Sequence, residues 1–258
     1  MKPKVKQPDD WQEFWEVMAL NNNPIAATDR PTISFETYQA YCRETDQKLS
    51  LNSADVLLDI GCGTGLMNGY LSHRTQKVIA TDYSFNMTRV AKQNAAKLEN
   101  VHIVTNTGMA IPFRNQTFSK VVLYSVTQYL SPGEFLAILR ELKHVTQPGA
   151  LILFGEIPRG RDETFLNRIK EVWKNEGLGG ILKKVRHRLV EITLIWLGRY
   201  TNIKKYVRPV SPATWHPYPE ELLALVEQAG MSGQILAQIQ DLPWFHQTFD
   251  LLVTNGKT

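Results

Sequence analysis

Short apolar runs alternate with amphipathic stretches between residues 55 and 156, and this alternation predicts how strands and helices follow one another. Each apolar run ends in glycine, proline or polar residues, as is typical of short strands buried in a parallel sheet. The stretches between them have the period of helices that cover such a sheet. The predicted strands are residues 55–60, 77–81, 101–104, 119–125 and 150–154, and the predicted helices are residues 66–73, 87–98 and 132–145.

Strands that alternate with helices predict an α/β fold that is Rossmann-like and doubly wound, with a mostly parallel sheet covered on both faces. The alternation lapses after Glu156 and resumes with one helix and two strands, predicted at residues 219–229, 235–239 and 249–254. Residues 158–217 therefore form a predicted helical insertion after the fifth strand. It would lie at the sheet edge where ligands bind, as a lid does.

The first fifty residues contain no strand pattern and are predicted to form a helical cap, residues 1–50, ahead of a main domain at residues 51–258. Aromatic residues cluster at Trp11, Phe14 and Trp15, and a second candidate helix covers residues 34–49. Both stretches are bounded by loops rich in asparagine, proline and threonine.

Composition adds few constraints. Hydrophobic residues make up 43% and charged residues 21% of the chain, as in ordinary globular proteins. Cys42 and Cys62 are too few for a disulfide framework or a zinc site, so we expect no metal and a reducing, cytoplasmic environment. The basic N-terminus lacks the apolar core of a signal peptide, and no apolar run is long enough to span a membrane.

The net charge of +4 is unevenly distributed. Residues 159–208 hold 13 Lys/Arg against 5 Asp/Glu, whereas the rest of the chain holds 16 against 20. Within this segment a basic patch at 183–188 runs into an apolar stretch at 189–197. Residues 183–197 are therefore compatible with peripheral contact at the inner face of an anionic membrane, or with a phosphate-bearing substrate. The alternatives are a solvated helix face, packing on the domain, and a homodimer contact.

The strongest local signal is a strand followed by Asp59-x-Gly61-x-Gly63-x-Gly65 and then a helix. Glycines let the backbone approach a ligand closely. Proteins that bind nicotinamide cofactors have a similar loop, but they carry a third glycine at the position of Leu66. The acidic residue Asp59 suits a cationic ligand instead. Asp82 ends the second strand 21 positions after Gly61, a spacing that suits a carboxylate bound to ribose hydroxyls.

These residues occur in the strings LLDIGCGTG, ATDYSFNM, IPF, TFSKVV and QPGA, which resemble class I S-adenosylmethionine (SAM)-dependent methyltransferases over about residues 54–156. The late helix EELLALVEQAGM is also similar. The resemblance implies SAM as cofactor, the loop glycines around its methionine part, Asp59 near its amine, Asp82 on its ribose, and Tyr83 and Met87 beside its adenosine. The expected cofactor residues are Asp59, Gly61, Cys62, Gly63, Gly65, Asp82, Tyr83, Met87, Thr107, Gly108, Met109 and Ser125.

The chain departs from the family pattern twice. An acidic residue commonly follows the third strand and accepts from the adenine amine, but this stretch begins with Asn106 and Thr107, either of which can still accept a bond. The common Phe-Asp before the fourth strand is Phe118-Ser119, a change that we interpret as structural.

Methyl transfer from a sulfonium asks the enzyme mainly to hold a nucleophile in line with the methyl group. A hydroxyl acceptor also needs a base. The acceptor site is expected where the fourth and fifth strands end, near Ser125, Gln128, Tyr129 and Glu156. His216, where the chain returns from the insertion, is the first candidate base, and Glu156 is the second. The alternative interpretation of His216 is a histidine packed in its loop, and that of Glu156 is a helix-capping or ion-paired carboxylate. The other histidines are expected to be structural.

The sequence thus predicts a SAM-dependent methyltransferase that acts on a hydroxyl or similar nucleophile of a small, anionic molecule such as a sugar or a phosphate-linked glycan intermediate. Two alternatives stay open. An RNA methyltransferase would explain the basic segment, but no RNA-binding module is recognisable, so nucleic acid is not the expected partner. A SAM-binding protein that does no chemistry would share the fold.

Overall fold

We analysed a computed structural model of the whole chain. It describes residues 11–21, 23–28, 33–107, 110–158, 173–174, 177–186, 189–190, 193, 215–237 and 248–256. Gly108, Met109 and most of the predicted insertion therefore lie outside the described residues. The described parts of the insertion at 173–174, 177–186, 189–190 and 193 are helical, and no described helix is long and apolar enough to cross a membrane.

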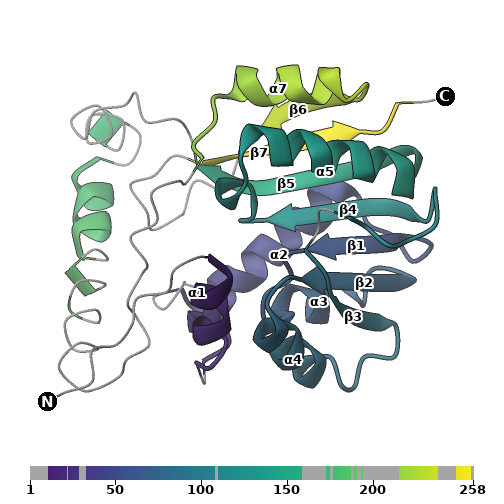
Figure 1. Cartoon of the computed structure of the whole chain (residues 1–258). Coiled ribbons are helices and arrows are strands. Elements are labelled where there is room, and N and C mark those ends of the chain that lie inside the picture. Colours follow the sequence, from purple (N-terminus) through teal and green to yellow (C-terminus); the bar gives the residue numbers. More distant parts are fainter. Residues whose placement is uncertain are drawn as a thin grey trace, which may run out of the picture.

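A seven-stranded sheet forms the centre of the molecule, with the strand order β3-β2-β1-β4-β5-β7-β6 (Figure 1). All neighbouring strands are parallel except β7, which runs antiparallel to both β5 and β6. The strands are β1 Val56–Ile60, β2 Lys77–Asp82, β3 Val101–Thr105, β4 Phe118–Tyr124, β5 Thr146–Pro158, β6 Ser232–Leu236 and β7 Thr248–Thr254.

Helices cover both faces of this sheet, as the sequence predicted (Figure 1). Along β1, Leu58 packs in a core cluster with residues of α5 and α7, whereas its neighbour Leu57 packs in a second cluster with residues of α2 and α3. This alternation follows from the pleat of a strand that is buried on both sides. The helices are α1 Trp11–Met18, α2 Phe35–Leu49, α3 Leu66–Leu71, α4 Phe85–Asn94, α5 Pro132–Val145 and α7 Pro219–Gln228, with short 3-10 turns η1 Ala26–Thr28 and η2 Thr127–Tyr129.

The predicted fold class and element order are confirmed, and the differences lie at element ends. The helix predicted from Met87 begins two residues earlier, because the Ser84 hydroxyl caps it by accepting from the Met87 N–H at 3.1 Å. The fifth strand begins at Thr146, which pairs with Phe118 of β4. In the predicted cap, α2 packs within the main core, since Tyr41 and other α2 residues share a cluster with β1 and β2.

Strand order reverses between β1 and β4, whose following helices cover opposite faces of the sheet. In doubly wound sheets the carboxyl ends of the strands at such a reversal open into a ligand-binding crevice. The carboxyl ends of β1, β2, β4 and β5 all lie at this edge, so the sheet brings the predicted site residues together.

Candidate functional site

The loop from β1 to α3 turns through three glycines in the left-handed region. Gly61, Gly63 and Gly65 have φ of 77°, 54° and 72°. The N–H groups of Gly61 and Cys62 both donate to the Thr81 carbonyl of β2, at 2.8 and 2.9 Å. The loop is thereby fastened to the end of the neighbouring strand.

Two of these glycines also permit close packing. A Cβ on Gly61 would lie 2.4 Å from Cγ2 of Val126, and a Cβ on Gly65 would lie 3.0 Å from Cβ and 3.2 Å from Cα of Ala91 in α4. The absence of side chains therefore lets the turn after β4 and the helix α4 both approach the loop closely.

Asp82, at the end of β2, is joined directly to the glycine loop. Its Oδ2 accepts from the Gly63 N–H and its Oδ1 from the Ser84 N–H, both at 2.9 Å. The pKa of this carboxyl is raised to about 6: burial is the largest cause, the hydrogen bonds from Ser84 and Gly63 lower the pKa, and the charge of Glu16 raises it. The glycine loop and Asp82, the residue expected to bind the ribose, thus lie in one site.

Asp59 lies beneath the loop as a second buried acid, with 3% of its surface exposed. The pKa of Asp59 is raised to about 7, mainly by burial and also by the negative charge of Asp82, while the N–H donor of the Asn68 side chain acts in the opposite direction. Burial, and then the charges of the same two acids, hold the pKa of the Cys62 thiol well above its ordinary value, so this thiol is neutral. Two buried acids that ionise reluctantly would be stabilised by a bound cation, and SAM carries a sulfonium and an ammonium.

Asn68 of α3 is a site residue that sequence reasoning missed. It is fully buried, and neither amide atom has a hydrogen-bond partner among the described residues at hydrogen-bond distance and angle. Its amide is nonetheless close enough to Asp59 to influence that carboxyl. A buried amide without partners is rare in folded proteins, and a polar ligand or water beside Asp59 would satisfy it. These observations fit the cofactor that the resemblance implies.

Residues ahead of the sheet cover this loop. Glu16 of α1 accepts from the Phe85 and Asn86 N–H groups at the start of α4, at 2.6 and 2.8 Å. The Thr64 hydroxyl of the loop donates to the Pro24 carbonyl at 3.2 Å, and Thr28 lies within contact distance of the position a Gly63 Cβ would take. No local pattern in the sequence marks these residues, because each acts on a partner far along the chain.

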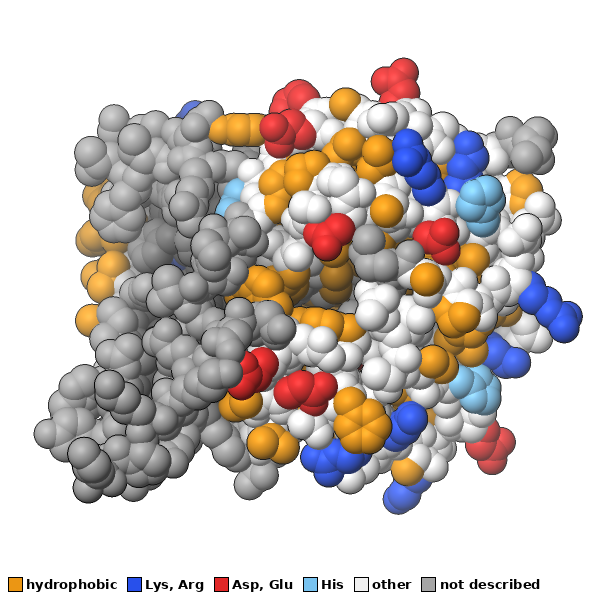
Figure 2. Space-filling view, in the orientation of Figure 1, with side chains coloured by type: hydrophobic (Ala, Val, Ile, Leu, Met, Phe, Trp, Pro, Cys, Tyr) orange, Lys and Arg blue, Asp and Glu red, His pale blue; other side chains and the backbone are white. Residues whose placement is uncertain are grey.

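The aromatic residues of α1 face the acceptor end of the crevice. The rings of Trp11 and Trp15 lie edge to face with that of Tyr129 in η2, with centroids 4.6 and 5.8 Å apart. Phe14 packs with Met87 in a small cluster between α1 and α4. Met87, expected beside adenosine, is therefore buried against α1, and Tyr83 lies half-buried just after Asp82. In Figure 2 hydrophobic side chains surround a hollow in this face, between α5 and α4.

Two residues with unusual backbone lie side by side where β4 and β5 end. Ser125 and Glu156 have φ of 59° and 56°, although neither is a glycine. The Ser125 N–H donates to the Gly155 carbonyl at 2.8 Å, and the Ser125 hydroxyl accepts from Nε2 of Gln128 at 3.1 Å. Backbone in this region is disfavoured for residues with a Cβ and tends to occur at functional sites. The acceptor-side residues predicted from the sequence are thus brought together.

His216, the first candidate base, is half-buried and follows a residue fixed to the same region. The Trp215 N–H donates to the Gln128 carbonyl at 3.1 Å, and the Trp215 ring packs edge to face on Phe135. Residues 215–218 therefore return beside η2, as expected. A catalytic role for His216 stays a prediction.

The remaining residues singled out in the sequence are either exposed at the surface or make structural hydrogen bonds. Thr107 is exposed after β3, and Asn106 donates from its amide to the Ala110 carbonyl at 3.0 Å, which helps to shape its own loop. The Ser119 hydroxyl bonds Asp55 at 2.7 Å and accepts from the Val56 N–H, so its predicted structural role is confirmed.

Comparison with known proteins connects this geometry to a family. Residues 57–149 match the family model described as "Methyltransferase domain". A malonyl-[acyl-carrier protein] O-methyltransferase of Marinomonas sp. is 32% identical over 139 residues, which are 51% of this chain and 50% of that protein. A demethylmenaquinone methyltransferase of Staphylococcus saprophyticus is 30% identical over 124 residues, 47% of this chain and 52% of that protein. The chain spans about half the length of the curated relatives it matches.

Solved structures share the fold over a larger part of the chain. A SAM-dependent methyltransferase from Aquifex aeolicus aligns with 83% of this chain and 88% of its own, with a TM-score of 0.51 and 18% identity. A geranyl diphosphate methyltransferase, in complex with GPP and sinefungin, aligns with 85% of this chain and 78% of its own, with a TM-score of 0.58 and 11% identity. At these identities the likeness concerns the fold.

Replacing Gly65 by alanine should destabilise the chain by about 2–3 kcal/mol, because a Cβ there meets both an unfavourable φ and the Ala91 backbone. Gly69→Ala is the matched control in the same helix, where a Cβ meets open space and should stabilise by about 0.5–1 kcal/mol. Urea unfolding measures both. A Gly65 variant as stable as the parent would contradict the packing described here.

The raised pKa values of Asp59 and Asp82 predict a pH dependence. The folded chain holds more protons than the unfolded chain above the ordinary value of 3.8, so without ligand the free energy of unfolding should fall as pH rises from there to about 7. A cationic ligand favours the ionised acids. SAM should therefore bind more tightly as pH rises from about 5.5 to 7.5, with release of protons.

Calorimetry in buffers of different ionisation enthalpy measures that proton release. Asp59→Asn should reduce it, since it removes the acid with the higher pKa. Proton release that Asp59→Asn leaves unchanged would show that Asp59 does not titrate with binding.

Proposed function

We propose that the chain is a class I SAM-dependent methyltransferase, since its residues 57–149 match a methyltransferase-domain family model, and that it transfers the SAM methyl group to an oxygen nucleophile of a small-molecule acceptor. The observation that carries this proposal is the bond from the Gly63 N–H to Asp82, which joins the glycine loop and the acid at the end of β2 in one crevice. Ligand binding at that edge is a general property of such sheets.

In this proposal the two acids have separate roles. Asp82 binds the ribose hydroxyls, because its oxygens keep acceptor capacity beside their bonds to Gly63 and Ser84. Asp59 and the buried amide of Asn68, whose atoms have no well-aligned hydrogen-bond partner among the described residues, are the groups that would bind the ammonium and carboxylate of the methionine part. Bound SAM supplies an electrophilic methyl group on its sulfonium. The protein supplies orientation and excludes water.

We assign proton removal to Glu156, with His216 as the alternative base. Glu156 is buried at the end of β5, next to Ser125, where an acceptor approaching the crevice would lie. When a hydroxyl acceptor loses its proton to this carboxylate, its oxygen forms the new bond to carbon as the carbon–sulfur bond breaks. The products are the methyl ether, S-adenosylhomocysteine and a protonated glutamate.

The aromatic wall of Trp11, Trp15 and Tyr129 supports an acceptor with a flat or apolar face. A sugar or phosphate-linked glycan intermediate meets this requirement, since sugar rings stack on aromatic side chains, and the cationic insertion suits its phosphate. The relatives' names suggest two further acceptors for comparison, a quinol and a malonyl thioester.

Formation of S-adenosylhomocysteine tests this function, with a nucleotide sugar, a polyprenyl-phosphate sugar, a naphthohydroquinone and a malonyl thioester as acceptors. We expect turnover with at least one of them. With a hydroxyl acceptor, Glu156→Gln should reduce kcat by about 100-fold or more while leaving the affinity for SAM unchanged. Asp82→Ala should weaken SAM binding by about 1–3 kcal/mol.

SAM binding without turnover on these acceptors or on a cell extract would favour the non-catalytic alternative. Turnover only on RNA would favour the RNA methyltransferase. Full SAM affinity in Asp82→Ala would remove that residue from the site.

We further propose that the insertion docks on an anionic bilayer. Leu178, Leu182 and Val185 share one face of the helical residues 177–186 and are 57%, 59% and 42% exposed. The exposed cations Lys183 and Arg186 stand beside this stripe. An apolar stripe flanked by cations is the geometry of a helix that lies in the membrane interface.

Co-sedimentation with vesicles tests the membrane proposal. The chain should bind phosphatidylglycerol vesicles and not phosphatidylcholine vesicles, and Lys183→Gln with Arg186→Gln should weaken binding about 30-fold, at about 1 kcal/mol per cation. Lys97→Gln with Arg114→Gln, at exposed cations of the main domain, is the matched control. Equal binding to both vesicle types contradicts the proposal, and self-association that Leu182→Ser abolishes would assign the stripe to a second copy.

A further inference from the structure

The backbone at Glu156 is held in a conformation that its own side chain disfavours. Between the pairs Phe154↔Leu251 and Ile157↔Phe249, two residues of β5 face the single residue Asp250 of β7. This is a β-bulge, and Glu156 stands in it with a φ of 56°. Glycine is the usual residue in such a position, so a glutamate there implies that the side chain is needed.

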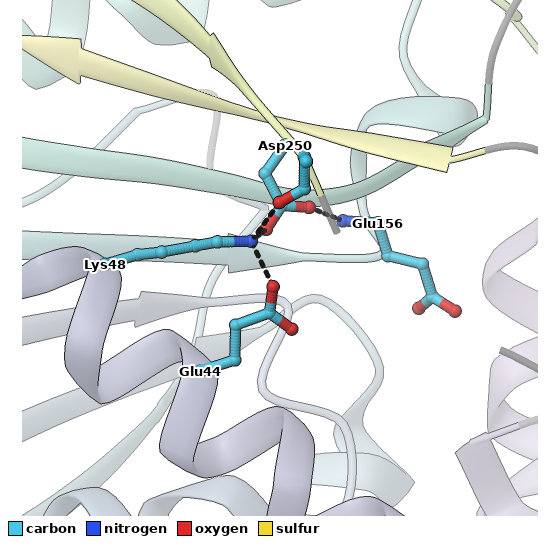
Figure 3. A network of polar contacts seen from close by, with 5 residues as sticks. Glu44, Lys48, Glu156 and Asp250 are labelled. Carbon is cyan, nitrogen blue, oxygen red and sulfur yellow. Dashed lines mark hydrogen bonds and ion pairs between the residues drawn. The ribbon is translucent and has the colours of Figure 1, made fainter. Parts of the chain in front are cut away.

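Asp250 stabilises this bulge from the neighbouring strand. Its side chain is almost fully buried, and its Oδ1 accepts from the Glu156 N–H at 2.8 Å. Its Oδ2 accepts from Nζ of Lys48 in α2 at 2.6 Å. One carboxylate thus joins α2 to the backbone of the strained residue (Figure 3).

Lys48 is itself fixed by further contacts. It pairs with Glu44 one turn earlier in α2, and it donates to the Ala237 carbonyl after β6 at 2.9 Å. A buried carboxylate requires such a partner, because removing one member of a buried ion pair leaves an uncompensated charge. The network therefore has a defined geometry that spans α2, β5 and β7.

The Glu156 side chain leaves this network instead of joining it. In Figure 3 its carboxylate points away from Asp250 and Lys48, while its N–H donates to Asp250. Directly after the adjacent strand β4, the Ser125 N–H donates to the carbonyl of Gly155, the residue before Glu156. The bulge thus directs the Glu156 carboxylate away from the ion pair of Lys48 and Asp250. This carboxylate lies at the sheet edge where β4 and β5 end.

We infer that Asp250 and Lys48 are positioning residues that hold the Glu156 carboxylate in place for the acceptor. This inference rests on the proposed function, because it assigns these residues to the same site. It also gives α2, which precedes the matched methyltransferase segment, a part in acceptor chemistry.

Kinetics with the acceptor that supports turnover provide the first test. Asp250→Asn and Lys48→Met should each lower kcat about 10- to 100-fold, the loss expected when a catalytic group is misplaced by about 1 Å, while the KM for SAM stays unchanged. Lys48→Arg keeps the charge and should restore most of the activity. Asp46→Asn breaks another ion pair of α2, with Arg74, and should match the parent.

Thermal unfolding tests the positioning without any acceptor. Glu156→Gly should raise Tm by about 2–4 °C by relieving the backbone, although it removes the carboxylate. In an Asp250→Ala background the backbone can relax, so the same change should raise Tm by clearly less. Equal gains in both backgrounds would overturn the inference, as would full kcat in folded Asp250→Asn.

The two tests separate the possible failures. If the parent forms no S-adenosylhomocysteine with any acceptor while the Tm gain depends on Asp250, the proposed function is wrong and the positioning of Glu156 stands. If the parent is active and the Tm gain does not depend on Asp250, the function stands and the positioning role is wrong.

Discussion

The hydrogen bond from the Gly63 N–H to the Asp82 carboxylate is the contact on which the rest of the site depends. It can form only because β1 and β2 are parallel and in register, with Ile60 opposite Thr81, so that both strands end at the same edge. The Thr81 carbonyl holds the start of the loop, and Asp82 holds its centre. The loop therefore has one conformation relative to the acid that would bind the ribose.

This arrangement buries two acids beside the glycine loop, and the raised pKa values of Asp59 and Asp82 follow from their desolvation. Burial of the acids is compatible with a stable fold because they can hold protons until a cation arrives. Strain collects at the same edge, in the left-handed backbone of Ser125 and Glu156. The remainder of the sheet, with a densely packed core on each face, can maintain that strain.

The residues that precede the matched segment complete the site. Glu16 fastens α1 to the start of α4, the aromatic residues of α1 pack on Tyr129, and Lys48 of α2 reaches Asp250 on β7. Each contact joins segments that are far apart in the chain. The N-terminal region is thus part of the crevice and of the core.

The sequence by itself determined the fold class, the order of the elements and the positions of Asp59, Asp82 and the loop glycines, because periodicity, turn residues and short motifs are local properties. Residues such as Glu16, Asn68, Lys48 and Asp250 have no local signal, since their roles depend on partners supplied by strand register and helix packing. The left-handed backbone at Glu156 is likewise decided by a bulge against β7, ninety-four residues further along the chain at Asp250. Long-range pairing alone brings these groups within hydrogen-bond distance, and it exists only in the tertiary structure.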